Sequence, residues 1–269
     1  MTTNRPEFLN PPLIEVACGI LFKPLSAFVT PYMGLLWREF KSDYPLCREV
    51  APLAPVIESF DDSKPAFRAE LTDIPPMPRS WFIGHNEHAI IQVQRDRFLH
   101  NWKKVSPDDQ YPRFHQVIDA FRNRLSTFKG FLAKHQLGSL QPLQYEITYV
   151  NHIPADTWQS PVQLGRVLPD FAWRNTPERF LPAAEAVNWR SIFVLPNQVG
   201  RLHVSVRTGT RQSDYSPVLL LDLTARGMPS DSSPDTMWSW FDLAHDWIVR
   251  AFADLTADDI QRTAWRRTQ

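Results

Sequence analysis

The sequence predicts an α+β protein made of two tandem β-α-β-β-β-α units, residues 1–139 and 140–269, packed closely as one globular body. Two observations support this prediction. Segments with the alternating polarity of strands are interleaved with segments whose apolar residues recur at helical spacing. The order of these segments in the first unit returns in the second, and the opening strands carry a glutamate at matching places, Glu15 and Glu146.

The first unit opens with an apolar stretch, Leu13–Phe22, that is expected to form a buried strand, and Pro31–Lys41 has the spacing of a short helix. Residues 45–66 contain several prolines and are expected to be irregular. The unit closes with the longest helical pattern of the chain, Tyr111–Gln136, whose apolar residues recur at steps of three and four. Between the short helix and this long helix, strands are predicted at Phe67–Leu71, Ser80–Gly84 and His88–Phe98, with a hairpin turn over residues 84–87.

The second unit repeats this order. Its predicted elements are a strand at Leu143–Ile153, a short helix at Val162–Phe171, strands at Trp189–Leu195, Arg201–Gly209 and Pro217–Arg226, and a long helix from Met237 to about Thr256. Antiparallel strands with helices on one side form a two-layer architecture. We therefore expect one curved antiparallel sheet with the long helices on one face, as in folds of the TATA-binding-protein type or the helix-grip type.

Polar side chains alternate with apolar ones along several of these strands, so they are expected to share the sheet face that the helices leave open. The candidate binding residues on this face are Glu15, Gln92, Gln94, Glu146, Thr148, His203, Arg207 and Asp222. Such a hydrogen-bonding surface suits a protein partner or a polar small molecule. Two alternatives remain open: His203 with Asp222 or Glu146 as the general acid–base pair of an enzyme, or ordinary exposure of a half-buried sheet to water.

The charge balance argues against non-specific nucleic-acid binding. Lys plus Arg and Asp plus Glu both number 29, so the chain lacks the long-range positive field that concentrates such proteins on phosphates. A local nucleic-acid site remains an alternative. The stretch Arg97–Lys104 mixes aromatic and basic residues, and the polar face of the 111–136 helix is mostly basic.

Several function classes lack their signatures in this sequence. No apolar run approaches the length of a membrane span, and the N-terminal residues lack the pattern of a signal peptide, so we expect a cytoplasmic protein with no membrane partner. The two cysteines, Cys18 and Cys47, form no CxxC motif, and no metal-ligand or phosphate-binding motif occurs. The sequence predicts neither a metal nor a cofactor.

A set of phrases in a fixed order carries a resemblance to a known family. The phrases are NPPLIEV at 10–16, IIQVQRDRFLHNWKK at 90–104, YPRF at 111–114, YEITYVNHI at 145–153, LDLTARG at 221–227 and WFDLAHDWIVRAFADLT at 240–256. Over nearly its whole length the chain resembles a sporadically distributed bacterial family of similar size, whose members are mostly uncharacterised. The resemblance implies a gene of mobile islands, such as toxin–antitoxin or phage-defence loci, and it carries over no catalytic residue. The sequence therefore predicts a non-enzymatic binding or protein-interaction module of a bacterial accessory system.

Overall fold

The computed structural model describes residues 5–60, 77–158, 161–172, 178–211, 214–229 and 233–268. The strand predicted at Phe67–Leu71 lies outside these residues. The strands are β1 (Leu13–Phe22), β2 (Leu46–Val50), β3 (Arg79–Ile83), β4 (Ala89–Gln94), β5 (Arg97–Lys103), β6 (Pro142–Pro154), β7 (Asn188–Val194), β8 (Arg201–Thr210) and β9 (Pro217–Gly227). The α-helices are α1 (Thr30–Phe40), α2 (Phe114–Lys134), α3 (Pro234–Leu255) and α4 (Asp258–Thr263), and the short 3-10 helices are η1 (Pro161–Arg166), η2 (Pro169–Phe171) and η3 (Pro196–Gln198).

Within the described residues, nine strands form one antiparallel sheet in the order β2-β3-β4-β5-β1-β6-β9-β8-β7. The sheet is open, with β2 and β7 at its two edges. Its centre is the pairing of β1 with β6, in which Cys18 lies opposite Ile147. This confirms the predicted α+β class and the single large antiparallel sheet that joins the two halves of the chain.

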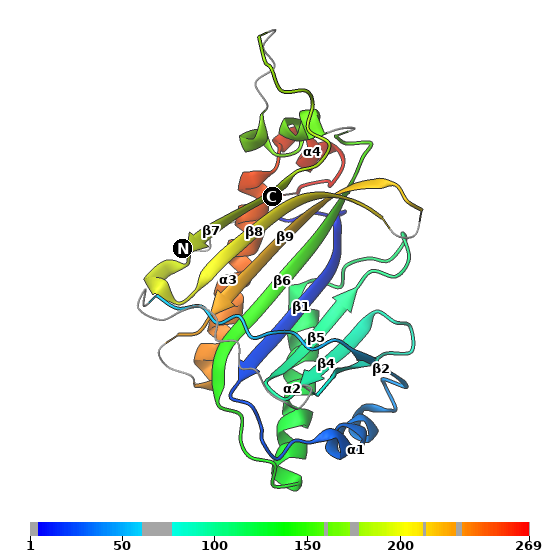
Figure 1. Ribbon diagram of the computed structural model, residues 1–269, viewed down its shortest axis with the longest axis vertical. Coiled ribbons are helices and arrows are strands. Elements are labelled where there is room, and N and C mark those ends of the chain that lie inside the picture. Colours follow the sequence, from blue (N-terminus) through cyan, green and yellow to red (C-terminus); the bar gives the residue numbers. More distant parts are fainter. Residues whose placement is uncertain are drawn as a thin grey trace.

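Helices α2 and α3 cover one face of the sheet (Figure 1), and the hydrophobic core lies between these two layers. The ring of Phe98 on β5 stacks on Phe128 of α2, with centroids 4.9 Å apart. Phe121 of α2 meets Phe241 of α3 edge-on at 5.5 Å, so the helices also pack against each other. The other face of the sheet is consequently free of helices in this view, as the alternation of polar residues predicted.

Three local predictions differ from the structure. The predicted strand His88–Phe98 is instead a hairpin, in which β4 and β5 flank a turn at Arg95 and Asp96. Residues 46–50, expected to be irregular, form the edge strand β2, which pairs with β3. The predicted helix at Val162–Phe171 consists of the two 3-10 helices η1 and η2. The first difference arises because the turn contains Asp96 but lacks the glycine that completes the usual two-residue hairpin signal.

Candidate binding site on the polar sheet face

Residues 51–60, called the strap from here on, cross the sheet face opposite α2 and α3 (Figure 1). The strap follows β2 and runs over the sheet from the first half of the chain to the second. Its two prolines, Pro52 and Pro55, hold the backbone extended and remove two N–H donors that would otherwise need partners. Because the strap crosses the strands rather than running beside one of them, its remaining backbone groups bond to side chains of the sheet or to water instead of to a neighbouring strand.

Two glutamines supply these bonds. The side-chain amide of Gln94, at the end of β4, accepts from the backbone N–H of Leu53 at 2.9 Å and donates to the carbonyl of the same residue at 3.1 Å. Gln144 of β6 accepts from the N–H of Glu58 and donates to the carbonyl of Val56, both at 2.8 Å. A carboxamide offers one acceptor and two donors, so it pairs with a peptide group much as a neighbouring strand would.

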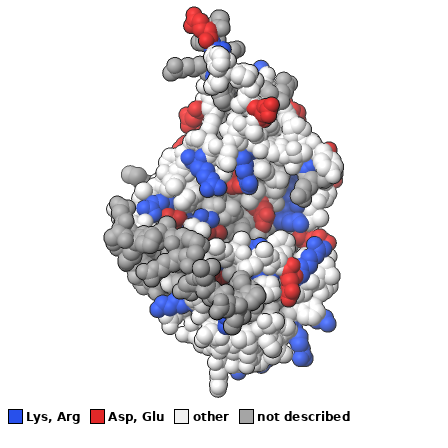
Figure 2. All heavy atoms as spheres, viewed as in Figure 1, with Lys and Arg blue, Asp and Glu red and all other residues white. Residues whose placement is uncertain are grey.

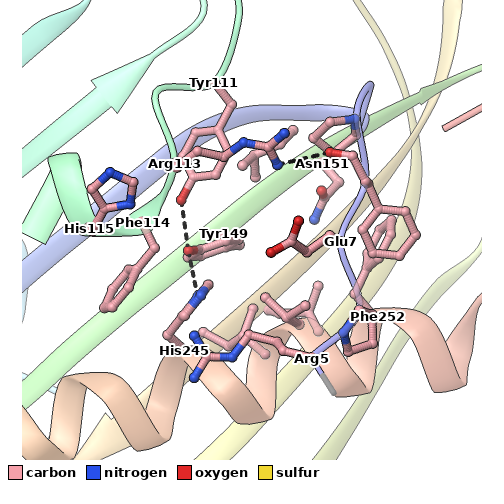
Figure 3. A pocket seen from close by; sticks show the side chains of 17 residues that line it. Arg5, Glu7, Tyr111, Arg113, Phe114, His115, Tyr149, Asn151, His245 and Phe252 are labelled. Atoms are coloured by element: carbon pink, nitrogen blue, oxygen red, sulfur yellow. Dashed lines mark hydrogen bonds between the residues drawn. The ribbon is translucent and has the colours of Figure 1, made fainter. Parts of the chain in front are cut away.

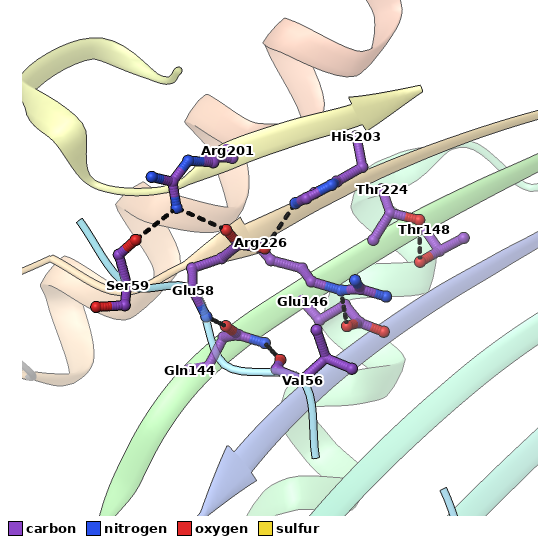
Figure 4. A network of polar contacts seen from close by, with 10 residues as sticks. All are labelled: Val56, Glu58, Ser59, Gln144, Glu146, Thr148, Arg201, His203, Thr224 and Arg226. Atoms are coloured by element: carbon purple, nitrogen blue, oxygen red, sulfur yellow. Dashed lines mark hydrogen bonds and ion pairs between the residues drawn. The ribbon is translucent and has the colours of Figure 1, made fainter. Parts of the chain in front are cut away.

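The end of the strap is fixed through its carboxylate (Figure 4). Glu58 accepts from Arg201 Nη1 at 2.9 Å and lies 2.6 Å from His203 Nε2. The same guanidinium donates to the carbonyl of Ser59 at 2.9 Å and lies 4.0 Å from the ring centroid of Phe60. Burial alone would raise the pKa of Glu58, but the hydrogen bonds from His203 and Arg201 outweigh it and lower that pKa. The strap is therefore held by a charged anchor as well as by backbone contacts.

A second polar network lies on the first half of the same face. Gln92 accepts from Arg79 at 2.7 Å and from the Trp81 ring N–H at 3.1 Å, and it donates to Asn101 at 2.9 Å. Asn101 in turn donates to the Glu15 carboxylate. Burial raises the pKa of Glu15, and this effect exceeds the opposing hydrogen bond from Asn101.

Ion pairs complete the second half of the face. Glu146 accepts from Arg226 at 2.6 Å, and Asp222 accepts from Arg207 at 2.9 Å. The hydroxyls of Thr148 and Thr224 lie 3.0 Å apart on neighbouring strands. Burial raises the pKa of Asp222, whose carboxylate also raises that of Glu15 through its charge. The charge of Asp222, on the second half of the face, therefore acts on Glu15, on the first half.

The eight predicted residues all belong to this face, and their contacts divide them into two groups. Gln94 and His203 contact the strap, whereas the other six bond to neighbours within the sheet. Sequence reasoning missed three residues of the strap site: Glu58, Gln144 and Arg201. Gln144 and Arg201 follow the same alternation as Glu146 and His203, so that signal was present, while nothing local marks Glu58.

The contacts of the residues concerned bear on the two alternative functions, an enzyme using His203 and a nucleic-acid-binding protein. His203 has Glu58 as its carboxylate neighbour, while the carboxylates proposed as its catalytic partners bind arginines. Most of the Arg97–Lys104 segment is the strand β5, in which residues 97–102 are buried. Three of the four Lys and Arg residues of α2 form ion pairs: Arg122 with Asp119, Arg124 with Asp43, and Lys134 with Glu39. Figure 2 shows basic and acidic side chains interspersed over the strap side of the molecule.

No group of three or more His, Cys, Asp or Glu side chains able to hold a metal ion occurs in the part of the chain that the structure describes. No helix among the described residues is long and apolar enough to cross a membrane. No protein-family model matches the chain, and no curated protein shows significant similarity to it.

We expect the strap anchor to weaken in acid. The folded-state pKa of Glu58 lies below its usual value of 4.5, so the anchor's contribution is complete above that value and is lost as the pH falls through the folded pKa. Glu58→Gln should lower the free energy of unfolding by about 2 kcal/mol near neutral pH, as for hydrogen bonds to charged groups. Denaturant unfolding of both proteins from about pH 6 to about pH 3 should show this difference shrinking towards zero.

The control is Glu185→Gln, at an exposed glutamate in the loop before β7. It should leave the free energy of unfolding unchanged, because surface substitutions away from special contacts have small effects. A Glu58→Gln effect that is equal at both ends of the pH range would contradict the role of the ionised carboxylate.

Proposed function

We propose that this protein is a non-enzymatic binding module whose polar sheet face receives an extended, acidic segment of a protein partner. The strap, in this proposal, occupies the partner's site from within the same chain. The observation that carries the proposal is the manner in which the strap is held, by two carboxamides on its backbone and by Arg201 and His203 on its one carboxylate.

This arrangement separates affinity from specificity. The bonds made by Gln94 and Gln144 go to backbone groups, so they accept any extended polypeptide of suitable shape. The pair Arg201 and His203 selects for a carboxylate at one position, because two such donors without an anion would be left unpaired beside the sheet. The expected partner segment therefore carries Asp or Glu where the strap has Glu58.

Occupation by the strap has a consequence for affinity. A segment joined to its site by a short tether has an effective concentration in the millimolar range, so an outside segment must displace a strong competitor. Weakening the strap should therefore strengthen the binding of an added peptide, and this is the opposite of what damage to the site would do.

The experiment uses a fluorescein-labelled peptide with the strap sequence, APLAPVIESF, added to the full chain and followed by fluorescence anisotropy. The Glu58→Gln variant keeps every residue of the sheet face but loses the charged anchor of its own strap. It should bind the peptide about tenfold more tightly than the unaltered chain does, because the tethered competitor is weakened.

Matched controls separate the site from general effects. In the Glu58→Gln background, Gln144→Ala should reduce peptide binding, whereas Gln116→Ala, at an exposed position on α2, should not. A labelled peptide with glutamine in place of its glutamate should bind weakly. Its affinity should match that of the original labelled peptide for the Arg201→Gln variant. Equal binding by the unaltered chain and the Glu58→Gln variant would refute the proposal.

The order of strands also supports an internal duplication with halves at 1–139 and 140–269, which we include in the proposal. The run β3-β4-β5-β1 on one side of the sheet centre has the same order along the chain as β7-β8-β9-β6 on the other. A long helix, α2 or α3, follows each set. Together with the resemblance to a sporadically distributed bacterial family, this favours a module of a cytoplasmic accessory system, of the defence or toxin–antitoxin kind.

A further inference from the structure

A cavity of about 410 Å³ lies on the helix side of the sheet, away from the strap (Figure 3). It exists because the two long helices do not match in extent. The first residue of α2, Phe114, stacks on His245 in the middle of α3, with ring centroids 4.0 Å apart. The remaining turns of α3, to Leu255, therefore extend past the first residue of α2. The N-terminal segment covers them, with Phe8 packed edge-on to Phe252 at 5.2 Å.

The wall formed by the N-terminal segment is fastened at several points. The backbone N–H groups of Leu9 and Asn10 donate to the carbonyls of Arg266 and Trp265, at 3.2 and 3.1 Å. Arg113, just before α2, donates to the carbonyl of Phe8 at 3.0 Å. The cavity is therefore bounded by backbone that is hydrogen-bonded on both sides, as in the preformed pockets that bind small molecules.

A chain of three hydrogen-bonded side chains lines one side of the cavity. The hydroxyls of Tyr111 and Tyr149 lie 3.0 Å apart, and the Tyr149 hydroxyl lies 2.9 Å from His245 Nδ1. Burial raises the pKa of both tyrosines and lowers that of His245 to about 3, so all three are uncharged at neutral pH. These groups offer neutral hydrogen bonds to the end of a ligand that enters between the aromatic rings.

Two opposite charges line the same cavity. Arg5, a third charged lining residue, is already paired with Asp246 at 3.1 Å. The Arg113 guanidinium makes one hydrogen bond, to a carbonyl, and no ion pair with any described residue, and the Glu7 carboxylate has no partner among the described residues. Figure 3 shows Glu7 directed from the N-terminal segment towards the cavity and Arg113 on the α2 side of it. The cavity thus offers one cationic and one anionic group that do not neutralise each other.

We propose that this cavity binds a small zwitterion with a planar aromatic body, of the aromatic amino-acid class. The carboxylate of such a molecule pairs with the fork of Arg113, and its ammonium pairs with Glu7. The aromatic body lies among Phe114, Phe252 and Ile248, and a polar ring atom reaches the hydroxyls of Tyr111 and Tyr149. This site is separate from the strap site, so it stands or falls independently of the function proposed above.

Three probes with the same ring system test the inference on the unaltered full-length chain by isothermal titration calorimetry. L-tryptophan has both charges, indole-3-propionate has only the carboxylate, and tryptamine has only the ammonium. L-tryptophan should bind about tenfold more tightly than either analogue, because each analogue lacks one of the two charge-assisted contacts. Equal affinities, a preference for either analogue, or the absence of binding by all three would overturn the inference.

Variants then assign the charges. Glu7→Gln should lower the affinity for L-tryptophan and tryptamine while leaving that for indole-3-propionate unchanged. Arg113→Lys, which keeps the positive charge but loses the fork, should weaken L-tryptophan and indole-3-propionate and spare tryptamine. Glu185→Gln, remote from the cavity lining, is the matched control and should change none of the three affinities. An unselective loss of affinity for all probes in Glu7→Gln would contradict the assigned role.

Discussion

Replacing Phe128 by alanine is expected to lower the free energy of unfolding by about 3–5 kcal/mol, the range for removing a fully buried phenylalanine. Phe128 is fully buried inside α2 and packs against three other rings. The distances between ring centroids are 4.9 Å to Phe98, 6.0 Å to Phe28 and 6.1 Å to Phe22. Truncation would leave a cavity between the helix and strands β1 and β5, because those rings belong to separate elements that cannot all move inwards. Guanidinium unfolding followed by circular dichroism measures the change.

The matched control for this substitution is Phe180→Ala. The side chain of Phe180 is 96% exposed, so its removal should change the unfolding free energy by less than about 0.5 kcal/mol. If the two substitutions had similar effects, the packing of α2 onto the sheet described above would be wrong.

Gly227→Ala should destabilise the protein by about 3 kcal/mol, through steric conflict rather than lost contacts. A Cβ at this position would lie 2.1 Å from the Val199 carbonyl oxygen and 2.4 Å from the Gly200 Cα. Both contacts are with backbone, which cannot rotate away as a side chain does. The entry to β8 and the end of β9 would therefore have to separate.

Gly130→Ala provides the opposite result for the same chemical change. Gly130 lies inside α2, and an added Cβ would meet no atom within 4 Å apart from the adjacent backbone of its own helix, so alanine there should stabilise the protein by about 0.5–1 kcal/mol. Denaturant unfolding of the two variants, compared with the unaltered chain, distinguishes them by sign. Because Gly227 adjoins the pairing of Arg201 with Arg226, its substitution should also weaken the strap anchor, which amide exchange of residues 53–58 would report.

Alternation of polar and apolar residues predicted the sheet and its polar face, because successive side chains of a strand point to opposite faces whatever the rest of the chain does. The same rule failed for β2, whose residues 46–49 are exposed and which therefore has no buried face to mark it. The rule also failed to detect the turn at Arg95 and Asp96, because the residues on both sides of the turn continue the strand pattern.

The two candidate sites were beyond local patterns for a different reason. The prolines of the strap indicate an extended chain, but its position over Gln144 and Arg201 depends on contacts between residues far apart in the sequence. The cavity likewise arises from the unequal extent of α2 and α3, which becomes visible only when the helices are placed against each other. In both cases the sequence shows which residue types are present, but it does not show which residues lie next to them in the folded protein.

The central pairing of the sheet has a consequence for how the chain folds during synthesis. Glu15 of β1 pairs with Lys103 on one side and with Val150 on the other, so both neighbours of this first strand are made much later. Contacts of such high contact order slow folding, because a long loop must close before they form. Until β6 leaves the ribosome, β1 presents an open edge on which another chain can pair. The centre of the finished sheet can thus form only after β6 is made, although β1 is the first strand of the chain.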